Sequence, residues 1–213
     1  MSNEPVRGAS QPRLLIDFSD NDTIPSCQTM SDGCLGGFST AQLSQVPATA
    51  TVPMHARLHG SISTELPRND PQVQQTGFAG WRNRDRPWTV FGKSLWDLDP
   101  YAFLALTVKS DGRKYFVNIQ TESVVYEDLH QHRLLTKTPG QWETVFIDLG
   151  AFVRTNHGLV VEPQKEMMVQ KIRTIGMSLT DRVPGPYDIS ISKVWATVRT
   201  TDKEVLEDRI PSE

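Results

Sequence analysis

The chain has 213 residues, of which 38% are hydrophobic and 22% charged, and this composition is ordinary for a globular protein. Its formal net charge of −3, with a pI near 6.0, gives no reason to expect binding to nucleic acid or to an anionic membrane. The longest charge-free stretch, residues 33–56, contains too many polar residues and prolines to span a bilayer.

The first part of the chain predicts short strands separated by turns. Residues 1–13 are polar and contain two prolines, so we expect them to be disordered. Residues 14–18 begin the first strand. The paired glycines Gly36 and Gly37 indicate a tight bend or a close backbone approach before the next strand. Residues 55–65 then alternate between apolar and polar side chains, which is typical of a strand.

The stretch around which the rest of the chain is organised is residues 98–121, LDPYAFLALTVKSDGRKYFVNIQT, which predicts two strands joined by a tight turn. The first strand is nearly apolar on both faces, as in a central strand that is covered on both sides. Asp111 and Gly112 tolerate the backbone angles that a hairpin turn needs. In the second strand Asn118 and Gln120 alternate with apolar residues. We therefore expect this hairpin to form the middle of a β-sheet.

The last third of the chain predicts three strands and one helix. Residues 142–149 alternate as a strand does, and residues 162–171 are the one predicted helix, because Pro163 suits a first helical position. The closing strands are residues 174–180 and 187–198. We expect a β-bulge near Lys193 in the second of these, since the apolar alternation changes phase there.

Many strands, frequent Gly and Pro turns and one short helix predict an all-β sandwich. The strand signals run without a separating linker, so we expect one sandwich domain over residues 14–199. The segment 1–13 precedes this domain, and a charged tail over residues 200–213 follows it.

Residues for catalysis or metal binding do not occur in a recognisable pattern. No nucleophile elbow is present, and the histidines lack Cys or carboxylate partners at metal-ligand spacing. Cys27 and Cys34 match no zinc pattern and are predicted to be free thiols. We therefore expect a protein that is not an enzyme, with no catalytic residues, no cofactor and no metal site.

The best candidate for a binding site is the basic and aromatic stretch 81–93. Arginine and tryptophan are enriched at the energetic centres of protein interfaces. If the segment is extended, alternate arginines would project to one side. The alternative is that the tryptophans belong to the core and the arginines to a solvated rim. The candidate partner-binding residues are Trp81, Arg82, Arg84, Arg86, Trp88 and Lys93.

Six motifs identify a resemblance to a known family. They are DGCLGGFS at 32–39, HGSIS at 59–63, GFAGWR at 77–82, DLDPYAFLALTVKSDGRKYF at 97–116, PGQWETV at 139–145 and IGMSLTDRVPGPYDISISKV at 175–194. Their order and spacing resemble those of the complex I intermediate-associated protein 30 family, over about residues 14–198. The resemblance implies a galactose-binding-domain-like jelly-roll sandwich.

The resemblance also implies a function. Mitochondrial members of the family are non-catalytic assembly factors, or chaperones, for respiratory complex I. The implied partners are a membrane-arm assembly intermediate and other assembly factors, for example complex I intermediate-associated protein 84 in fungi. The implied location is the matrix side of the inner mitochondrial membrane, with peripheral attachment to that membrane.

Two other functions stay open at this stage. A carbohydrate-binding module would need an exposed aromatic platform on the concave sheet, to which Trp81, Trp88 or Trp142 would contribute. An RNA-binding accessory domain would use the basic stretch 81–93 and would bind with steep salt dependence. The net acidity of the chain argues against the second of these.

Overall fold

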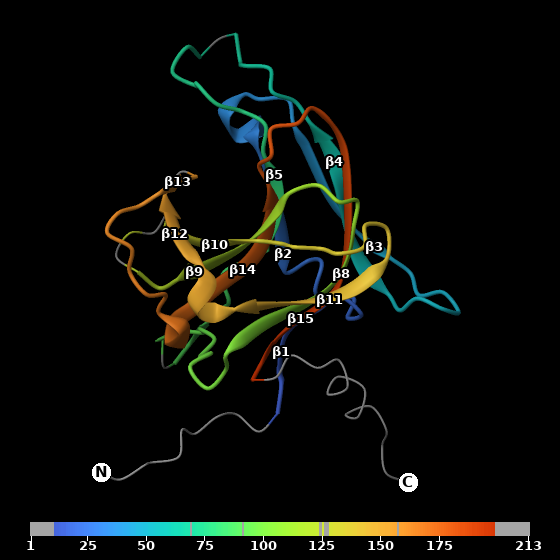
Figure 1. Ribbon diagram of the computed structural model, residues 1–213, viewed down its shortest axis with the longest axis vertical. Coiled ribbons are helices and arrows are strands. Elements are labelled where there is room, and N and C mark those ends of the chain that lie inside the picture. Colours follow the sequence, from blue (N-terminus) through green and yellow to red (C-terminus); the bar gives the residue numbers. More distant parts are fainter. Residues whose placement is uncertain are drawn as a thin grey trace.

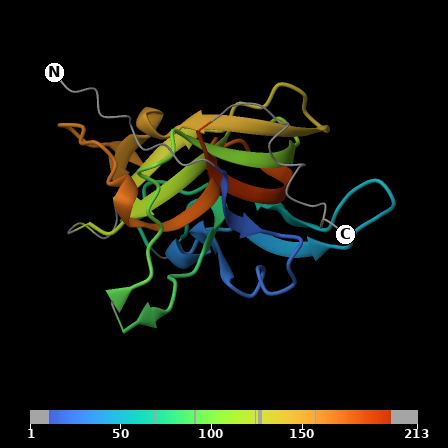
Figure 2. The same cartoon turned by 90° about the horizontal axis from the view of Figure 1, so that it is seen from below.

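The computed structural model describes residues 11–198, apart from residues 69, 91, 124, 126, 127 and 157. Two antiparallel β-sheets pack face to face, with loops and short helical turns at their ends (Figures 1 and 2). The predicted all-β sandwich is thereby confirmed. The predicted tail over residues 200–213 and most of the N-terminal segment 1–13 lie outside the described residues, and the first strand begins at Arg13.

The first sheet has the strand order β11-β8-β15-β4-β3, and β1 pairs with the part of β15 that lies beyond β4. Its strands are β1 (Arg13–Asp17), β3 (Thr40–Val46), β4 (His55–Ile62), β8 (Phe103–Ser110), β11 (Trp142–Asp148) and β15 (Gly185–Thr197).

The second sheet has the order β13-β12-β10-β9-β14-β5-β2. Its strands are β2 (Cys27–Ser31), β5 (Ala79–Asn83), β9 (Tyr115–Thr121), β10 (Leu129–Arg133), β12 (Val153–Asn156), β13 (Leu159–Val160) and β14 (Ile172–Leu179). A small hairpin of β6 (Trp88–Thr89) and β7 (Gly92–Lys93) stands apart from both sheets (Figure 2).

The core lies between the sheets and consists of the inward-facing residues of their central strands. Alternation places every second side chain of a strand on that face, and in this chain those side chains are apolar. The buried set includes Leu104, Leu106 and Val108 of β8, Val117 and Ile119 of β9, Ile175 and Met177 of β14, and Ile189, Ile191 and Val194 of β15.

The predicted hairpin over residues 98–121 is wrong in one respect, because its two strands do not pair with each other. β8 lies between β11 and β15 in the first sheet, and β9 lies between β10 and β14 in the second. Both strands are central, as their apolar faces predicted. The turn between them carries the chain from one sheet to the other, since other strands occupy all four of their edges.

Arg113 holds this crossover turn against another connection. Its guanidinium donates to both carboxylate oxygens of Asp181, at 3.0 and 2.7 Å, and to the backbone carbonyls of Val183, Gly185 and Pro186. Burial alone would raise the pKa of Asp181, but the hydrogen bonds from Arg113 and the Val183 N–H, with the Arg113 charge, lower that pKa overall. The connection between β14 and β15 is therefore fixed to the crossover turn.

Gly112 in this turn has φ of +91°, and a Cβ atom on it would lie 3.1 Å from Pro139 Cγ. We expect Gly112→Val to lower the free energy of unfolding by about 1 kcal/mol or more, because valine is strained at positive φ. Urea unfolding followed by circular dichroism measures this. Lys114→Val, at an exposed position in the same turn, should change stability by less than about 0.5 kcal/mol. Equal stabilities of the two variants would contradict the role of Gly112.

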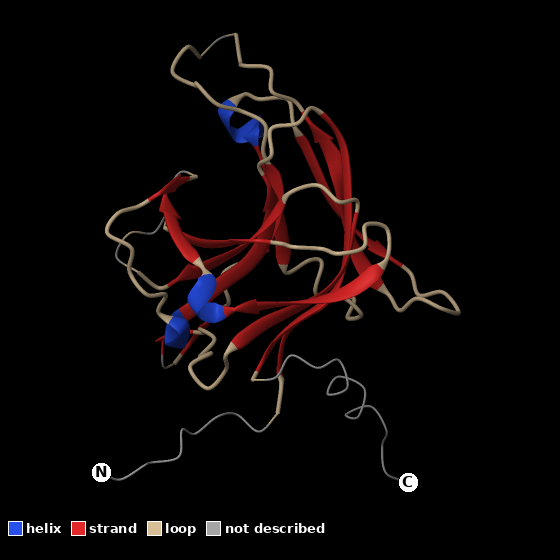
Figure 3. Ribbon diagram, in the orientation of Figure 1, coloured by secondary structure: helices blue, strands red, loops and turns tan. Residues whose placement is uncertain are grey.

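The predicted helix over residues 162–171 is also wrong. The structure describes all of these residues, and only Val169–Lys171 form a 3₁₀ helix, η3 (Figure 3). Met167 and Val169 pack against the core whereas Met168 is exposed, which is the alternation of an extended chain. The carbonyl of Val169 accepts a hydrogen bond from the Leu98 N–H at 2.8 Å. Tertiary packing therefore overrides the weak helical signal here. Two further 3₁₀ helices are η1 (Asp32–Leu35) and η2 (Leu149–Ala151).

Other strand predictions are confirmed, and some strands were missed. The register of β15 against β8 shifts between Ile191 and Lys193, where a bulge was predicted. The missed strand β10 has the sequence LHQHR, whose only apolar residue is Leu129, so it carries no apolar alternation. The strands β12 and β13 are too short to show a pattern.

Asp32 is fully buried and joins three segments of the chain. Its carboxylate accepts hydrogen bonds from the Ser39 N–H at 2.8 Å, the Ser39 hydroxyl at 2.7 Å and the Gly77 N–H at 2.6 Å. A Cβ atom on Gly37 would lie 2.5 Å from Asp32 Cγ, so the close approach predicted from the paired glycines is confirmed. The buried charge is compensated by these hydrogen bonds.

We expect Asp32→Asn to lower the free energy of unfolding by about 2 kcal/mol or more. An amide has only one acceptor oxygen, so its NH₂ group would face the N–H of Ser39 or of Gly77 and leave a buried donor unpaired. Chemical unfolding measures the loss, and Asp22→Asn at an exposed position is the matched control. A variant as stable as the control would show that the charge at Asp32 is not needed for folding.

Candidate functional site

The predicted binding stretch 81–93 does not form a single surface. Trp81 and Arg82 belong to β5, residues 84–87 leave the sheet as an extended link, and Trp88 and Lys93 belong to the hairpin β6–β7. The six candidate residues therefore lie on three different parts of the chain.

Trp81 is a core residue. Its side chain is 1% exposed and makes an edge-to-face contact with Phe18, with the ring centroids 5.1 Å apart. The strand β5 turns this position toward the inside of the sandwich. Trp81 therefore presents no surface to a partner, and for this residue the alternative interpretation as a core tryptophan is correct.

Trp88 lies on the projecting hairpin and is 73% exposed, and Val90 at the hairpin turn is 95% exposed. The Lys93 ammonium lies 5.8 Å from the centroid of the Trp88 ring and 2.5 Å from Glu122 Oε1. These contacts connect the hairpin to the end of β9. The hairpin, which projects from the sandwich (Figure 2), thus presents an exposed aromatic and an exposed aliphatic side chain to the surroundings.

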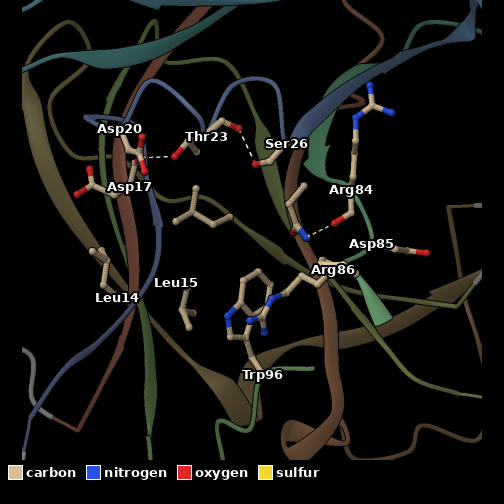
Figure 4. A pocket seen from close by; sticks show the side chains of 13 residues that line it. Leu14, Leu15, Asp17, Asp20, Thr23, Ser26, Arg84, Asp85, Arg86 and Trp96 are labelled. Atoms are coloured by element: carbon tan, nitrogen blue, oxygen red, sulfur yellow. Dashed lines mark hydrogen bonds between the residues drawn. The ribbon is translucent and has the colours of Figure 1, made fainter. Parts of the chain in front are cut away.

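The three arginines have different environments and do not form one row. Arg82 donates to the Asn83 carbonyl at 3.1 Å, and Arg84 Nε donates to the Cys27 carbonyl at 3.1 Å. Arg86 instead lies over the ring of Trp96, with its Cζ atom 4.9 Å from the ring centroid. Figure 4 shows the guanidinium of Arg84 pointing away from that of Arg86. The expected one-sided projection fails because the chain leaves β5 between these residues.

A pocket of about 580 Å³ lies beside Arg86 (Figure 4). One wall is β1 together with the loop that follows it, and the other wall is the extended link 84–87. Its lining residues are Leu14, Leu15, Ile16, Asp17, Asp20, Thr23, Ser26, Asn83, Arg84, Asp85, Arg86, Pro87 and Trp96.

The Arg86 guanidinium makes no hydrogen bond and no ion pair with any described residue, and its one close contact is the ring of Trp96. Burial, and next the positive charge of Arg13, lower the pKa of Arg86. An arginine side chain stays protonated in proteins even so. The pocket therefore contains a partly buried positive charge that no described carboxylate contacts.

The described residues contain no group of three or more His, Cys, Asp or Glu side chains that could hold a metal ion. Their helices are all too short or too polar to cross a lipid bilayer. Both cysteines are free thiols, and burial raises the pKa of Cys27 to about 11, so that thiol stays protonated.

The sequence did not indicate the pocket. The pocket joins residues that are far apart in the sequence, since Leu14 precedes Arg86 by 72 positions. Only the packing of β1 beside the link 84–87 brings Leu14, Leu15 and Trp96 together around Arg86. A single tryptophan and a leucine pair carry no binding signal by themselves, because such residues usually belong to a core.

Comparison with known proteins identifies the family. The family model described as complex I intermediate-associated protein 30 matches residues 16–191. The chain belongs to this family. Membership confirms the resemblance that the six motifs indicated.

Two relatives show how far the similarity extends. A protein of Neurospora crassa, named complex I intermediate-associated protein 30, mitochondrial, is 47% identical over 225 residues, which cover 97% of this chain and 81% of the relative. A Mus musculus protein of the same name is 27% identical over 184 residues, covering 85% of this chain and 55% of the relative. The chain thus spans about half the length of the mouse protein.

Among solved structures, a family 11 carbohydrate-binding module of Clostridium thermocellum has a TM-score of 0.63 and 13% identity, covering 90% of this chain and 97% of the module. A second structure of a family 11 module from this organism, in complex with a mixed-linked tetrasaccharide, has a TM-score of 0.61 and 13% identity, covering 89% of this chain and 97% of the module. These similarities show the fold, a β-sandwich like that of these modules.

The tryptophans named for a sugar platform do not gather on one face. Trp81 is in the core, Trp88 is on the hairpin and Trp142 is on β11, where its ring packs edge to face against His55. The outward face of the second sheet is polar instead. A row of hydrogen bonds crosses it through Thr155, Gln131, Asn118 and Ser178.

We expect replacement of Trp81 and replacement of Trp88, the two tryptophans of residues 81–93, to differ in their effect on the free energy of unfolding. Trp81→Ala should lower the free energy of unfolding by about 3–5 kcal/mol, because it leaves a cavity between the sheets. Trp88→Ala should change it by less than about 0.5 kcal/mol. Far-UV circular dichroism during chemical unfolding measures both without relying on tryptophan fluorescence. Similar losses in the two variants would contradict the assignment.

Proposed function

We propose that this protein is a non-catalytic assembly factor for mitochondrial respiratory complex I. The observation that carries the proposal is membership of the complex I intermediate-associated protein 30 family over almost the whole described chain. The names of the relatives associate them with a complex I intermediate and with mitochondria. We infer for this chain a membrane-arm intermediate and other assembly factors as partners, with peripheral attachment on the matrix side of the inner membrane.

The proposal that the protein is not an enzyme is supported by the roles of its buried charged groups. Asp32, Asp128 and Asp181 are each held by hydrogen bonds or ion pairs that connect segments of the fold. These groups are used for structure, and such saturated carboxylates are poorly suited to proton transfer.

We further propose that residues 82–93 contact a protein partner. Trp88 and Val90 supply exposed apolar surface on a projecting hairpin, and Arg82, Arg84 and Arg86 lie close to it in the chain. A large exposed aromatic side chain beside arginines is the usual composition of an interface anchor. Arginine pairs with carboxylates in a bidentate way, so an acidic partner surface fits this stretch.

The two alternative functions have less support. Carbohydrate binding would require a shared platform for the tryptophans, and they lie in separate environments. RNA binding would require unpaired basic side chains on the hairpin, but the Lys93 charge is paired with Glu122, and the chain is acidic overall.

We expect Arg82→Glu combined with Arg84→Glu to weaken capture of the assembly intermediate while the fold is retained. Reversed charges repel an acidic partner surface. Within the fold Arg82 contacts the Asn83 carbonyl and the Asp85 carboxylate, and Arg84 contacts the Cys27 carbonyl, all at the end of β5 and outside the core. A pull-down from mitochondrial extract and a melting curve, on the same variant, are the two measurements. Arg133→Glu combined with Lys137→Glu, at exposed positions outside the stretch, is the matched control for total charge.

The outcomes separate the interpretations. Full capture by a folded double variant would exclude these arginines from the interface. Loss of folding would assign Arg82 and Arg84 a structural role instead. Reduced capture by the control to the same extent would indicate a general charge effect and would also argue against the proposed surface.

A further inference from the structure

The pocket beside Arg86 has the shape of a groove between two extended segments. Residues 14–17 of β1 form one side and residues 84–87 form the other, with Trp96 between them (Figure 4). Trp96 is 7% exposed and forms a firm floor. A groove with two extended walls suits an extended chain better than a compact ligand.

The edge of β1 that borders this groove has no strand beside it among the described residues. β1 pairs with β15 along one edge, and no second described strand pairs with it. Four consecutive residues of β1, 14–17, all line the pocket. Because successive side chains of a strand point to opposite faces, a pocket lined by all four must run along the edge of the strand. At Asp17 the backbone carbonyl already accepts hydrogen bonds from the Asp20 N–H and the Thr23 hydroxyl, so the open part of this edge is residues 14–16. Unpaired strand edges are templates for a further strand.

The groove is charged differently at its two ends. At one end Arg86 has no hydrogen bond and no carboxylate partner, and Arg13, which donates to the Asp97 carbonyl at 2.9 Å, adds a second positive charge nearby. Asp85 also lies at this end, but its carboxylate is paired with Arg82 at 3.5 Å and with Arg173 at 3.6 Å. At the other end are Asp17 and Asp20 (Figure 4). The N–H donors of Arg86 match a carboxylate, which accepts two parallel hydrogen bonds from a guanidinium.

We infer that this groove binds an extended segment of the protein partner, which adds to the free edge of β1 and places an acidic side chain on Arg86. The inference rests on the proposed function, since it names a contact of the same partner. The opposite charge at Asp17 and Asp20 selects a neutral or basic residue at the other end of the segment and so sets its direction. The stacking of Arg86 on Trp96 holds the guanidinium in place before binding, which reduces the entropy lost on binding.

The test uses the purified full chain and two pairs of acetylated, amidated peptides. Ac-KTVTVE-NH₂ has its glutamate at the C-terminal end, and the reverse peptide, Ac-EVTVTK-NH₂, has it at the N-terminal end. Each peptide is compared with a version in which Gln replaces Glu. Backbone amide and tryptophan indole signals are followed by NMR with ¹⁵N-labelled protein. We expect one of the Glu peptides to shift signals of residues 14–17 and of Trp96, and its Gln version to bind about tenfold more weakly or worse.

Variants provide the second measurement. Arg86→Gln should remove the preference for Glu over Gln, and Arg86→Lys should restore part of it, because lysine keeps the charge but not the paired donors. Arg133→Gln, at an exposed position, should bind as the unchanged protein does. The comparison of Glu and Gln peptides on the unchanged protein needs no variant, so it stands even if Arg86→Gln is poorly folded.

Three outcomes would overturn the inference. The first is an absence of shifts at millimolar peptide. The second is equal binding of the Glu and Gln peptides. The third is that sodium phosphate alone shifts the Trp96 signal while no peptide shifts residues 14–17, which would indicate a site for a small anion only. The capture experiment with Arg82 and Arg84 does not involve Arg86, so failure of the peptide test and failure of the proposed function are distinguishable.

Discussion

The buried carboxylate of Asp32 is the constraint on which one end of the sandwich depends. A charge removed from water must be compensated by hydrogen bonds, and Asp32 obtains them from Ser39 and Gly77. Asp32 follows β2 of the second sheet, Ser39 precedes β3 of the first, and Gly77 precedes β5 of the second. The same three hydrogen bonds therefore position strands of both sheets, and the paired glycines are needed because Gly37 passes directly over the carboxylate.

This constraint reaches the candidate site through β2 and β5. The two strands pair in register from Cys27 opposite Asn83 to Ser31 opposite Ala79. Where β5 ends, the Arg84 N–H donates to the Ser26 carbonyl at 2.7 Å, and the Arg84 side chain donates to Cys27. The link 84–87 is thus held along the end of β2, and this position directs Arg86 over Trp96 and sets the width of the groove opposite β1.

The proposed contact surface combines two kinds of interaction. The hairpin β6–β7 offers exposed apolar area through Trp88 and Val90, which a partner can bury. The groove offers a strand edge, which fixes the direction of a bound segment, and the charge of Arg86, which selects an acidic side chain. A partner that uses both would need an extended acidic segment next to an apolar patch, and only a protein with that arrangement would satisfy both sites.

The sequence by itself determined where most strands run and what kind of protein this is. Apolar alternation located β4, β11, β14 and β15 and the bulge at Lys193, and the six motifs indicated the family, because both signals are local. Alternation also showed that residues 98–121 form two central strands. Only the tertiary structure decided that these strands belong to different sheets, that residues 162–168 are not helical, and that Trp81 is buried while Trp88 is exposed. These outcomes depend on which distant strand occupies each edge, and no local pattern of apolar residues specifies that choice.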